Sequence, residues 1–249
     1  MPKKQKWFED DNLWQAVMPI LFDKNRIANA SGEVDDMITL AGVQPGSQVL
    51  DLCCGIGRHS VQFAKRGFEV TGVDKTRQYL AAARGSAKGL GIKVKFVLND
   101  MLRYRKDNFY DLAISYFSSF GYFENRDDDC KVAENVCASL VGGGKFLLDI
   151  VGKETIARNY QKKNWREEQG LIVLEERIIE DNWAGINTRW IIIKDGKRTD
   201  LNIFHRLYSA VELIGLLRQS GFSDVKVYGD IKGRPYDADA SRLIAVAVK

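Results

Sequence analysis

The chain is organised around one segment, Val49-Leu50-Asp51-Leu52-Cys53-Cys54-Gly55-Ile56-Gly57-Arg58-His59-Ser60. It begins as an apolar run with an acidic residue, passes through two glycines one residue apart, and ends in residues that start a helix. This order predicts a strand, a tight turn and a helix, and such a turn is where open α/β sheets bind ligands. Gly55 and Gly57 lack a Cβ and readily take positive φ, so the backbone there can approach a ligand closely.

A second acidic strand end points to a ribose. Phe68-Glu69-Val70-Thr71-Gly72-Val73-Asp74 is an apolar strand whose final acid stands 23 residues after Asp51, near the roughly 20-residue offset of a ribose-binding carboxylate. Both oxygens of an ionised carboxylate accept hydrogen bonds, so Asp74 can hold both ribose hydroxyls. The dinucleotide fingerprint G-x-G-x-x-G is not met, because Ser60 stands at its sixth position counted from Gly55. A pyrophosphate dinucleotide is therefore the weaker expectation.

The spacing D-x-x-x-G-x-G resembles motif I of the class I S-adenosylmethionine-dependent methyltransferases, usually D-x-G-x-G-x-G, with Cys53 here in place of the first glycine. Further strand ends follow at Asp74, at Asn99-Asp100-Met101, and in the run 110–117, which matches motif IV in position. The resemblance is strong over residues 45–150 and is closest to the bacterial small-molecule type, methyltransferase domain 11/25-like. It implies S-adenosyl-L-methionine as cofactor and S-adenosyl-L-homocysteine as product.

The resemblance also implies a set of site residues. Asp100 would receive the adenine amino group and Met101 would pack on the ring, while Ser115-Tyr116-Phe117-Ser118 replaces the N-P-P-Y of adenine-amino and glutamine-amide methyltransferases and counts against those substrates. The cofactor-binding residues are expected to be Asp51, Cys53, Gly55, Ile56, Gly57, Asp74, Lys75, Asp100, Met101, Ser115 and Tyr116. The catalytic residues stay unknown, with Tyr122, Tyr116 and His205 as candidates, because aromatic faces attract cations and histidine titrates near neutral pH.

Strands and helices alternate from Pro45 to Val151, which predicts a parallel sheet with helices on both faces. The expected strands are 48–53, 68–73, 93–98, 110–115 and 144–151, with helices 58–66, 76–89 and 127–140, and with Gly142-Gly143-Gly144 as the turn into the fifth strand. After Lys153 the pattern changes to three strand-like runs, 171–181, 187–194 and 197–208, the last two joined by the hairpin turn Asp195-Gly196. A helix at 210–220 and strands 224–229 and 242–248 end the chain.

The expected fold is an α/β, Rossmann-like doubly wound sheet of seven mostly parallel strands with an antiparallel β insert and an N-terminal helical extension. The expected divisions are 1–44 as helical lid or extension, 45–152 as cofactor-binding core, 165–208 as the insert, forming a substrate lid or dimer contact, and 209–249 as the end of the core. In the N-terminal part, Ser31 is expected to cap a helix that ends at Gly42. Trp7, Phe8, Phe22 and Arg26 are lid candidates by the same resemblance, with anchoring to the core as the open alternative.

Composition narrows the function classes. The 249 residues are 45% hydrophobic, enough for a buried core, and the net charge of +4 is spread too thinly to argue for nucleic acid. Four cysteines without a C-x-x-C pair, together with two histidines, argue against a metal site. Free thiols and the lack of a signal-peptide pattern or membrane span predict a cytoplasmic protein, monomeric or homodimeric.

We therefore expect a methyltransferase that moves the sulfonium methyl group to a small-molecule acceptor by in-line displacement. The protein must hold donor and acceptor together and exclude water, and it needs a base only if the acceptor arrives protonated. Two alternatives stay open: an RNA or protein methyltransferase, and a non-methyltransferase nucleotide-binding protein on the same fold.

Overall fold

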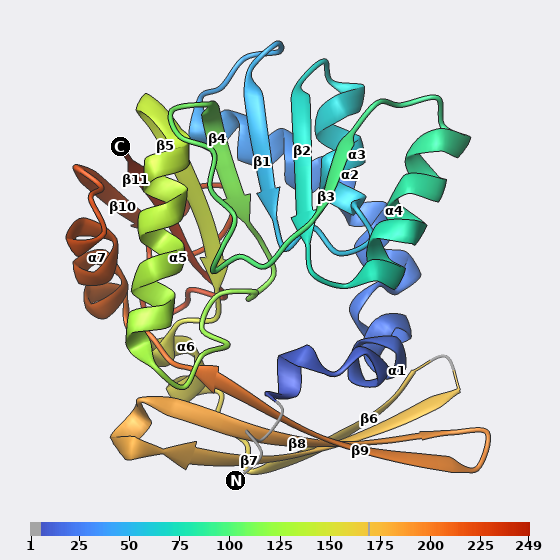
Figure 1. Ribbon diagram of the computed structural model, residues 1–249. Helices are drawn as coiled ribbons and strands as arrows, with labels where there is room; N and C mark the ends of the chain where they lie inside the picture. Colours follow the sequence, from blue (N-terminus) through green and yellow to red (C-terminus); the bar gives the residue numbers. More distant parts are fainter. Residues whose placement is uncertain (1–5, 169) are drawn as a thin grey trace, which may run out of the picture.

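Residues 6–168 and 170–249, the part that the computed structural model describes, form two sheets (Figure 1). The larger has seven strands in the order β10-β11-β5-β4-β1-β2-β3. β11 runs antiparallel to both of its neighbours, β10 and β5, and the other neighbouring strands of this sheet are parallel. This confirms the Rossmann-like fold class. The strands are β1 (Gln48–Leu52), β2 (Glu69–Asp74), β3 (Lys95–Leu98), β4 (Tyr110–Ser115), β5 (Leu140–Ile150), β10 (Asp224–Tyr228) and β11 (Leu243–Val248).

Helices cover both faces of this sheet because its central strands are apolar on both sides. Val49 of β1 belongs to one apolar cluster with α2 (Lys24–Ala41) and α3 (Arg58–Lys65). Its neighbour Leu50 points the other way, into the cluster that includes α5 (Arg126–Ser139) and α7 (Ala210–Gln219). The remaining core helix, α4 (Arg77–Gly89), follows β2. Alternate residues of one strand thus build two separate cores.

The helix before β1 is longer than expected. It begins at Lys24, because the side chain of Asp23 caps it by accepting hydrogen bonds from the backbone N–H groups of Asn25 and Arg26 at 2.8 and 3.0 Å. The prediction that Ser31 is the cap is therefore wrong; Ser31 lies in mid-helix, where its hydroxyl accepts a bond from Arg66 at 2.9 Å. The predicted end at Gly42, which has a φ of 63°, is confirmed.

The three glycines before the fifth strand do not form the expected turn, because β5 already begins at Leu140 and contains them. Pairing with β4 jumps from Tyr110 opposite Leu140 to Leu112 opposite Lys145, so the extra residues form a bulge. Gly143 makes this possible with a φ of 78°. A glycine run can thus lie within a strand where the partner strand is shorter.

The second sheet is built by the insert and is separate from the first. Its strands are β6 (Lys163–Glu168), β7 (Leu171–Glu180), β8 (Gly185–Lys194) and β9 (Lys197–Arg206), paired antiparallel in that order. The predicted two-residue turn is confirmed, with φ of 49° and 72° at Asp195 and Gly196. Two elements were not expected: the short helix α6 (Lys153–Arg158) and the edge strand β6, whose residues are mostly polar.

The insert sheet lies across the carboxyl ends of the parallel strands, with α1 (Asp11–Leu21) between the two sheets (Figure 1). Leu13, Val17 and Ile20 of α1 pack on the insert in an apolar cluster with Leu171, Val173, Ile192, Leu201 and Ile203. Two single-turn 3-10 helices complete the fold: η1 (Trp7–Glu9) precedes α1, and η2 (Asp181–Trp183) links β7 to β8. The ligand-binding edge of the parallel sheet therefore faces the insert sheet, with α1 between them.

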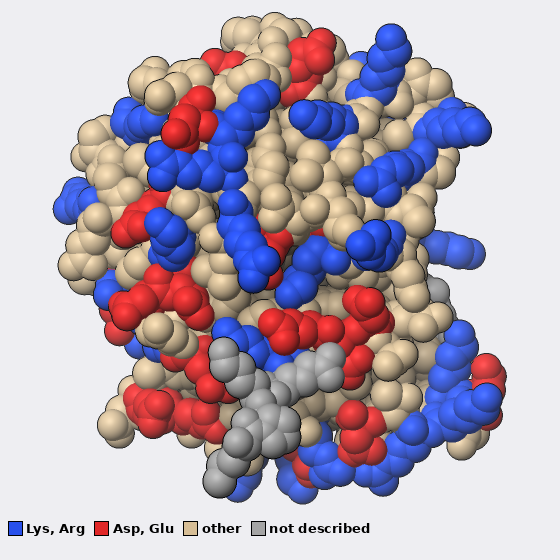
Figure 2. All heavy atoms as spheres, in the orientation of Figure 1, with Lys and Arg blue, Asp and Glu red and all other residues tan. Residues whose placement is uncertain are grey.

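Acidic and basic side chains are interspersed on the face of the molecule shown in Figure 2. Within the described residues, no helix has the length and apolar character to cross a membrane.

Candidate active site

The turn after β1 brings bare backbone to the edge of the sheet. Cys53, Gly55 and Gly57 have φ of 62°, 56° and 73°, in the left-handed region. A Cβ on Gly55 would lie 2.6 Å from Cζ of Phe22, so only glycine fits beneath that ring. A Cβ on Gly57 would lie 2.8 Å from Cζ of Phe96 of β3, so Gly57 is needed for packing against the sheet. Gly55 is thus required beneath the ring of Phe22, and Gly57 by packing against the sheet.

Asp74 stands at the end of β2 with its carboxylate held by this turn. Its Oδ2 accepts from the backbone N–H of Gly55 and its Oδ1 from that of Thr76, both at 2.8 Å. Burial raises the pKa of this carboxyl, while the two backbone hydrogen bonds oppose the rise. Each oxygen keeps a further lone pair, so the fixed carboxylate can still accept a hydroxyl group.

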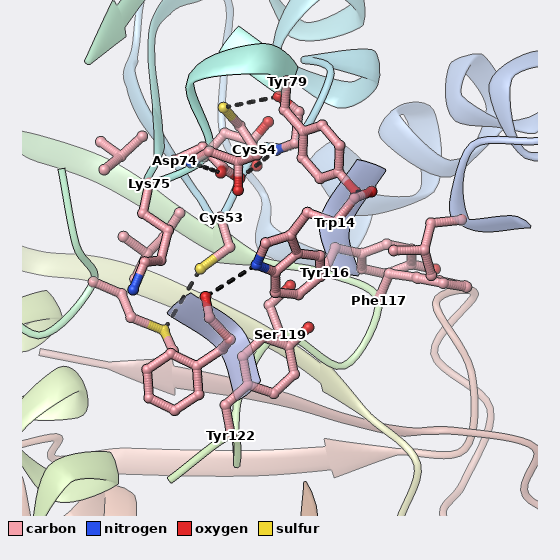
Figure 3. Close-up of a pocket in the computed structure, with 18 of the residues that line it drawn as sticks. Trp14, Cys53, Cys54, Asp74, Lys75, Tyr79, Tyr116, Phe117, Ser119 and Tyr122 are labelled. Carbon is pink, nitrogen blue, oxygen red and sulfur yellow. Dashed lines mark hydrogen bonds between the residues drawn. The ribbon is translucent and has the colours of Figure 1, made fainter. Parts of the chain in front are cut away.

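A cavity of about 110 Å³ opens beside Asp74, and the labelled side chains of Figure 3 converge on it. Most of the predicted site residues line it, namely Asp51, Cys53, Gly55, Asp74, Lys75, Asp100, Met101, Tyr116 and Tyr122. Ile56 and Gly57 lie outside this lining, as does Ser115, which is buried within β4. These residues come from the ends of β1, β2, β3 and β4, which the parallel sheet brings to one edge.

Two acids near the cavity are held in place. Asp51 is 2% exposed and accepts a hydrogen bond from Ser60 Oγ at 2.5 Å; burial raises the pKa of its carboxyl. Asp100 lies 3.4 Å from Lys75 Nζ, and that ammonium stands 4.9 Å from the centre of the Phe8 ring. All three side chains line the cavity, but the carboxylate of Asp51 is held by Ser60, whereas Asp100 and Lys75 pair with each other.

Two of the sulfur atoms in the lining, those of Cys53 and Met101, lie side by side. Cys53 Sγ is 3.5 Å from Met101 Sδ, and burial raises the pKa of the Cys53 thiol well above its usual range. The thiol therefore stays protonated, and Cys53 acts as a small apolar neighbour of Met101. Within the described residues no group of three or more His, Cys, Asp and Glu side chains could hold a metal ion.

The N-terminal segment covers the cavity. Phe8, Trp14 and Phe22 line it. Trp14 Nε1 donates to the carbonyl of Phe8 at 3.0 Å, and the hydroxyl of Tyr79 donates to the carbonyl of Trp14 at 2.6 Å, which fastens the segment to α4 (Figure 3). Two of the lid candidates, Phe8 and Phe22, thus line the cavity.

The other two lid candidates pack around its rim. Trp7 lies against Tyr122 with ring centres 4.8 Å apart, and the Arg26 guanidinium stands 4.3 Å from the ring centre of Phe117.

Several lining residues were not predicted as cofactor contacts, among them Trp14, Arg58, His59, Thr76, Tyr79 and Asn99. His59 Nε2 lies 2.7 Å from Glu33 Oε2, which also accepts a hydrogen bond from Arg58 Nη1 at 3.2 Å. Asn99 follows directly after β3, so its place at a strand end could have predicted that it lines the cavity. Nothing in the sequence around Trp14 predicts this, because only the path of α1 brings Trp14 to the cavity.

A second, larger cavity of about 530 Å³ lies between α6 and the insert sheet. Its lining mixes apolar side chains with a few polar and charged ones. His205 lines this cavity and not the first. Burial lowers the pKa of His205 to about 4, so its imidazole is neutral at pH 7.

The segment after β4 forms the wall between the two cavities. Ser119 and Tyr122 line the first, whereas Ser118 and Phe120 line the second. Tyr122 meets His205 across this wall, with ring centres 5.1 Å apart. The two cavities are therefore separated by little more than one stretch of chain.

The wall begins in a strained conformation. Phe117 and Ser118 both have positive φ, 72° and 60°, which costs non-glycine residues about 1–3 kcal/mol each. Asp149 holds them: its Oδ2 accepts from Phe117 N–H at 2.7 Å and its carbonyl from Ser118 N–H at 3.0 Å. Arg242 in turn donates to both carboxylate oxygens of Asp149 at 2.7 Å. Strain held in this way commonly marks a functional segment.

Comparison with known proteins agrees with this geometry. Residues 49–144 match a family model described as a methyltransferase domain. A glycine/sarcosine N-methyltransferase of Halorhodospira halochloris is 26% identical over 227 residues, covering 89% of this chain and 82% of that protein. A 23S rRNA (uracil(747)-C(5))-methyltransferase of Pyrococcus abyssi (strain GE5 / Orsay) is 44% identical over only 52 residues, 21% of this chain and 13% of that protein.

Among solved structures, an S-adenosylmethionine-dependent methyltransferase from Clostridium acetobutylicum ATCC 824 superposes with a TM-score of 0.78 at 17% identity. The match covers 95% of this chain and 96% of that one, so the fold is shared throughout, insert included.

Proposed function

We propose that this chain, whose residues 49–144 match the model of a methyltransferase domain, transfers a methyl group from S-adenosylmethionine to a small-molecule acceptor held in the second cavity. The donor would occupy the first cavity. The observation that carries this proposal is the shared wall: residues of one segment, 116–123, line both cavities, so a donor and an acceptor would meet across it.

The residues of the first cavity fit the cofactor. Gly55 leaves room that any Cβ would fill, and Asp74 is fixed at the point where ribose hydroxyls would be held. Asp100, with Met101 beside it, lines the same cavity at the end of β3. When bound, S-adenosylmethionine supplies an electrophilic sulfonium methyl group.

The N-terminal segment must shift to admit it. The present volume of about 110 Å³ is below the roughly 300–1,000 Å³ of typical ligand pockets. Phe22 over Gly55 and Phe8 and Trp14 beside it are the side chains that occupy the space. Closing this segment again would keep water from the reacting groups, which favours transfer.

On the acceptor side, the protein orients the nucleophile. His205 lines the second cavity at the wall and is neutral at pH 7, so its imidazole can accept a hydrogen bond from the acceptor; a pKa of about 4 makes it too weak a base to hold a proton drawn from the acceptor at pH 7. Tyr122 presents its ring between the cavities and would face the cationic methyl donor. Burial raises the pKa of Tyr122, so it remains a neutral phenol.

A small molecule is favoured over RNA as acceptor. The insert forms one wall of the second cavity, and acidic side chains interrupt the basic ones on the surface of Figure 2. The relative matched over most of the chain is named for glycine and sarcosine, whereas the rRNA enzyme is matched over a short part. We also propose that the insert serves as the acceptor lid and that the protein is cytoplasmic and monomeric or homodimeric.

Calorimetry with S-adenosylhomocysteine and with NADH tests the donor site, because only a methyltransferase should bind the first and ignore the second. Transfer of labelled methyl groups into small-metabolite fractions or into bulk RNA then identifies the acceptor class. Binding of NADH alone would overturn the proposal, and labelling of RNA alone would replace the small-molecule acceptor.

A further inference from the structure

One acidic side chain interrupts the inner face of the insert sheet. On β7, alternate residues point toward the core of the molecule, and Leu171 and Val173 of this set are buried and apolar. Glu175 is the next member and is only 4% exposed. A carboxylate on a buried sheet face is costly unless it is paired.

Two arginines pair with this carboxylate. Arg166 of β6 donates to Oε1 of Glu175, and Arg177, two residues further along β7, donates to Oε2. Arginine stays protonated in proteins, so the three side chains together carry one surplus positive charge. Burial, and after it the charge of Arg166, lowers the pKa of Arg177. Such buried ion clusters rarely stabilise a fold more than apolar residues would, which argues for a role in binding.

The surplus charge faces the second cavity. Glu175 and Arg177 both line it, and both oxygens of Glu175 are already occupied by guanidinium groups. Arg177 lines the cavity and Arg166 does not, so the surplus charge of the cluster reaches the cavity through Arg177, whose Nη1 also donates to the carbonyl of Gln161 at 3.2 Å. Much of the remaining lining is apolar: Phe120, Ile150, Val151, Ile156, Ile186, Ile203 and Leu207.

Within the function proposed above, we propose that the acceptor is an organic monocarboxylate with an apolar body, its carboxylate bound by Arg177 and its reacting atom beside His205. The single surplus charge of the cluster matches a monoanion. Arg177 lies opposite Thr188, and His205 opposite Ile186, so their Cα atoms are about 12 Å apart across β8. The methylated atom is thus several bonds away from the carboxylate.

The test uses the protein saturated with S-adenosylhomocysteine and three probes of one shape: 3-phenylpropanoate, 3-phenylpropanamide and 3-phenylpropylammonium. Calorimetry should show the carboxylate binding at least tenfold more tightly than the amide, and the ammonium most weakly. Equal binding of carboxylate and amide would overturn the inference. Preference for the ammonium would overturn it too and would make Glu175 the recognition group.

Variants locate the effect. Arg177→Gln should abolish the tenfold preference while leaving amide binding unchanged. Glu175→Gln should retain or strengthen carboxylate binding, whereas loss of carboxylate binding in this variant would count against Glu175 as a mere counter-ion. Arg189→Gln is the matched control, because Arg189 lies on the outer face of the same sheet, bound to Asp200.

Binding of S-adenosylhomocysteine to each variant reports on folding and on the proposed function separately. A wild-type protein that ignores S-adenosylhomocysteine fails the proposed function. A protein that binds it but shows no preference among the probes fails only the acceptor inference.

Discussion

Replacing Asp74 by alanine tests the donor site directly. The carboxylate is fixed by two backbone N–H groups at 2.8 Å and would accept both ribose hydroxyls. Hydrogen bonds to a charged group contribute about 1.5–3 kcal/mol each, so loss of two should cost at least about 3 kcal/mol, or roughly a hundredfold in Kd. Asp74→Asn keeps the size and one acceptor oxygen and should cost about tenfold. Calorimetry with S-adenosylhomocysteine measures both.

The control is Asp111→Asn. Asp111 also accepts a backbone hydrogen bond, from Gln48 N–H at 2.7 Å, but lies near the opposite end of the parallel strands and outside the cavity lining. Its variant should bind S-adenosylhomocysteine as the wild type does. Unchanged Kd in Asp74→Ala, with an unfolding midpoint near that of the control, would refute the assignment of the ribose to β2.

Three further outcomes follow from the geometry. Gly55→Ala should lower the free energy of unfolding by about 1–2 kcal/mol, because φ is 56° there and the new Cβ would clash with Phe22. Adding Phe22→Ala should restore the part of the loss that comes from this clash. No restoration would mean that the whole loss comes from backbone strain. Tyr79→Phe removes the bond to the Trp14 carbonyl and should speed dissociation of S-adenosylhomocysteine in stopped-flow traces, whereas an unchanged rate would mean that the N-terminal segment does not gate the site. Burial raises the pKa of Asp129 to about 7, above its unfolded value. The native state therefore keeps a proton that the unfolded chain loses, and the free energy of unfolding should fall as pH rises from 5 to 7. In urea titrations Asp129→Asn should remove about 2 kcal/mol of that fall, and a pH profile identical to that of the wild type would contradict the assignment.

Sequence order alone predicted the parallel core because its signals are local. Apolar runs that end at Asp74, at Leu98 and at Ser115 specify strands, and parallel strands deliver their carboxyl ends to one edge. That is why most of the predicted cofactor residues line one cavity. One exception has a local cause as well, because Ser115 is buried within β4.

Other features depended on the partner strand or on a competing cap. Asp23 outcompetes Ser31 as a helix cap because its carboxylate takes two backbone N–H groups at once. The glycine run around Gly143 becomes a bulge because β4 is shorter than β5. The edge strand β6 has too few apolar residues to show alternation, and it is defined by its pairing with β7.

The acceptor side could not be predicted because its residues converge only through the second sheet. Ile186 and His205 pair across β8 and β9, while Tyr122 comes from the loop after β4, so the wall joins segments more than 80 residues apart in the sequence. The clearest sequence signal for the acceptor site was Glu175, an acidic residue among the apolar inward-facing residues of β7, since a buried carboxylate needs a charged or hydrogen-bonding partner. In this fold the donor site follows from strand ends in the sequence, whereas acceptor specificity follows from the register of the insert, and a one-residue shift of β7 would turn Glu175 and Arg177 to solvent.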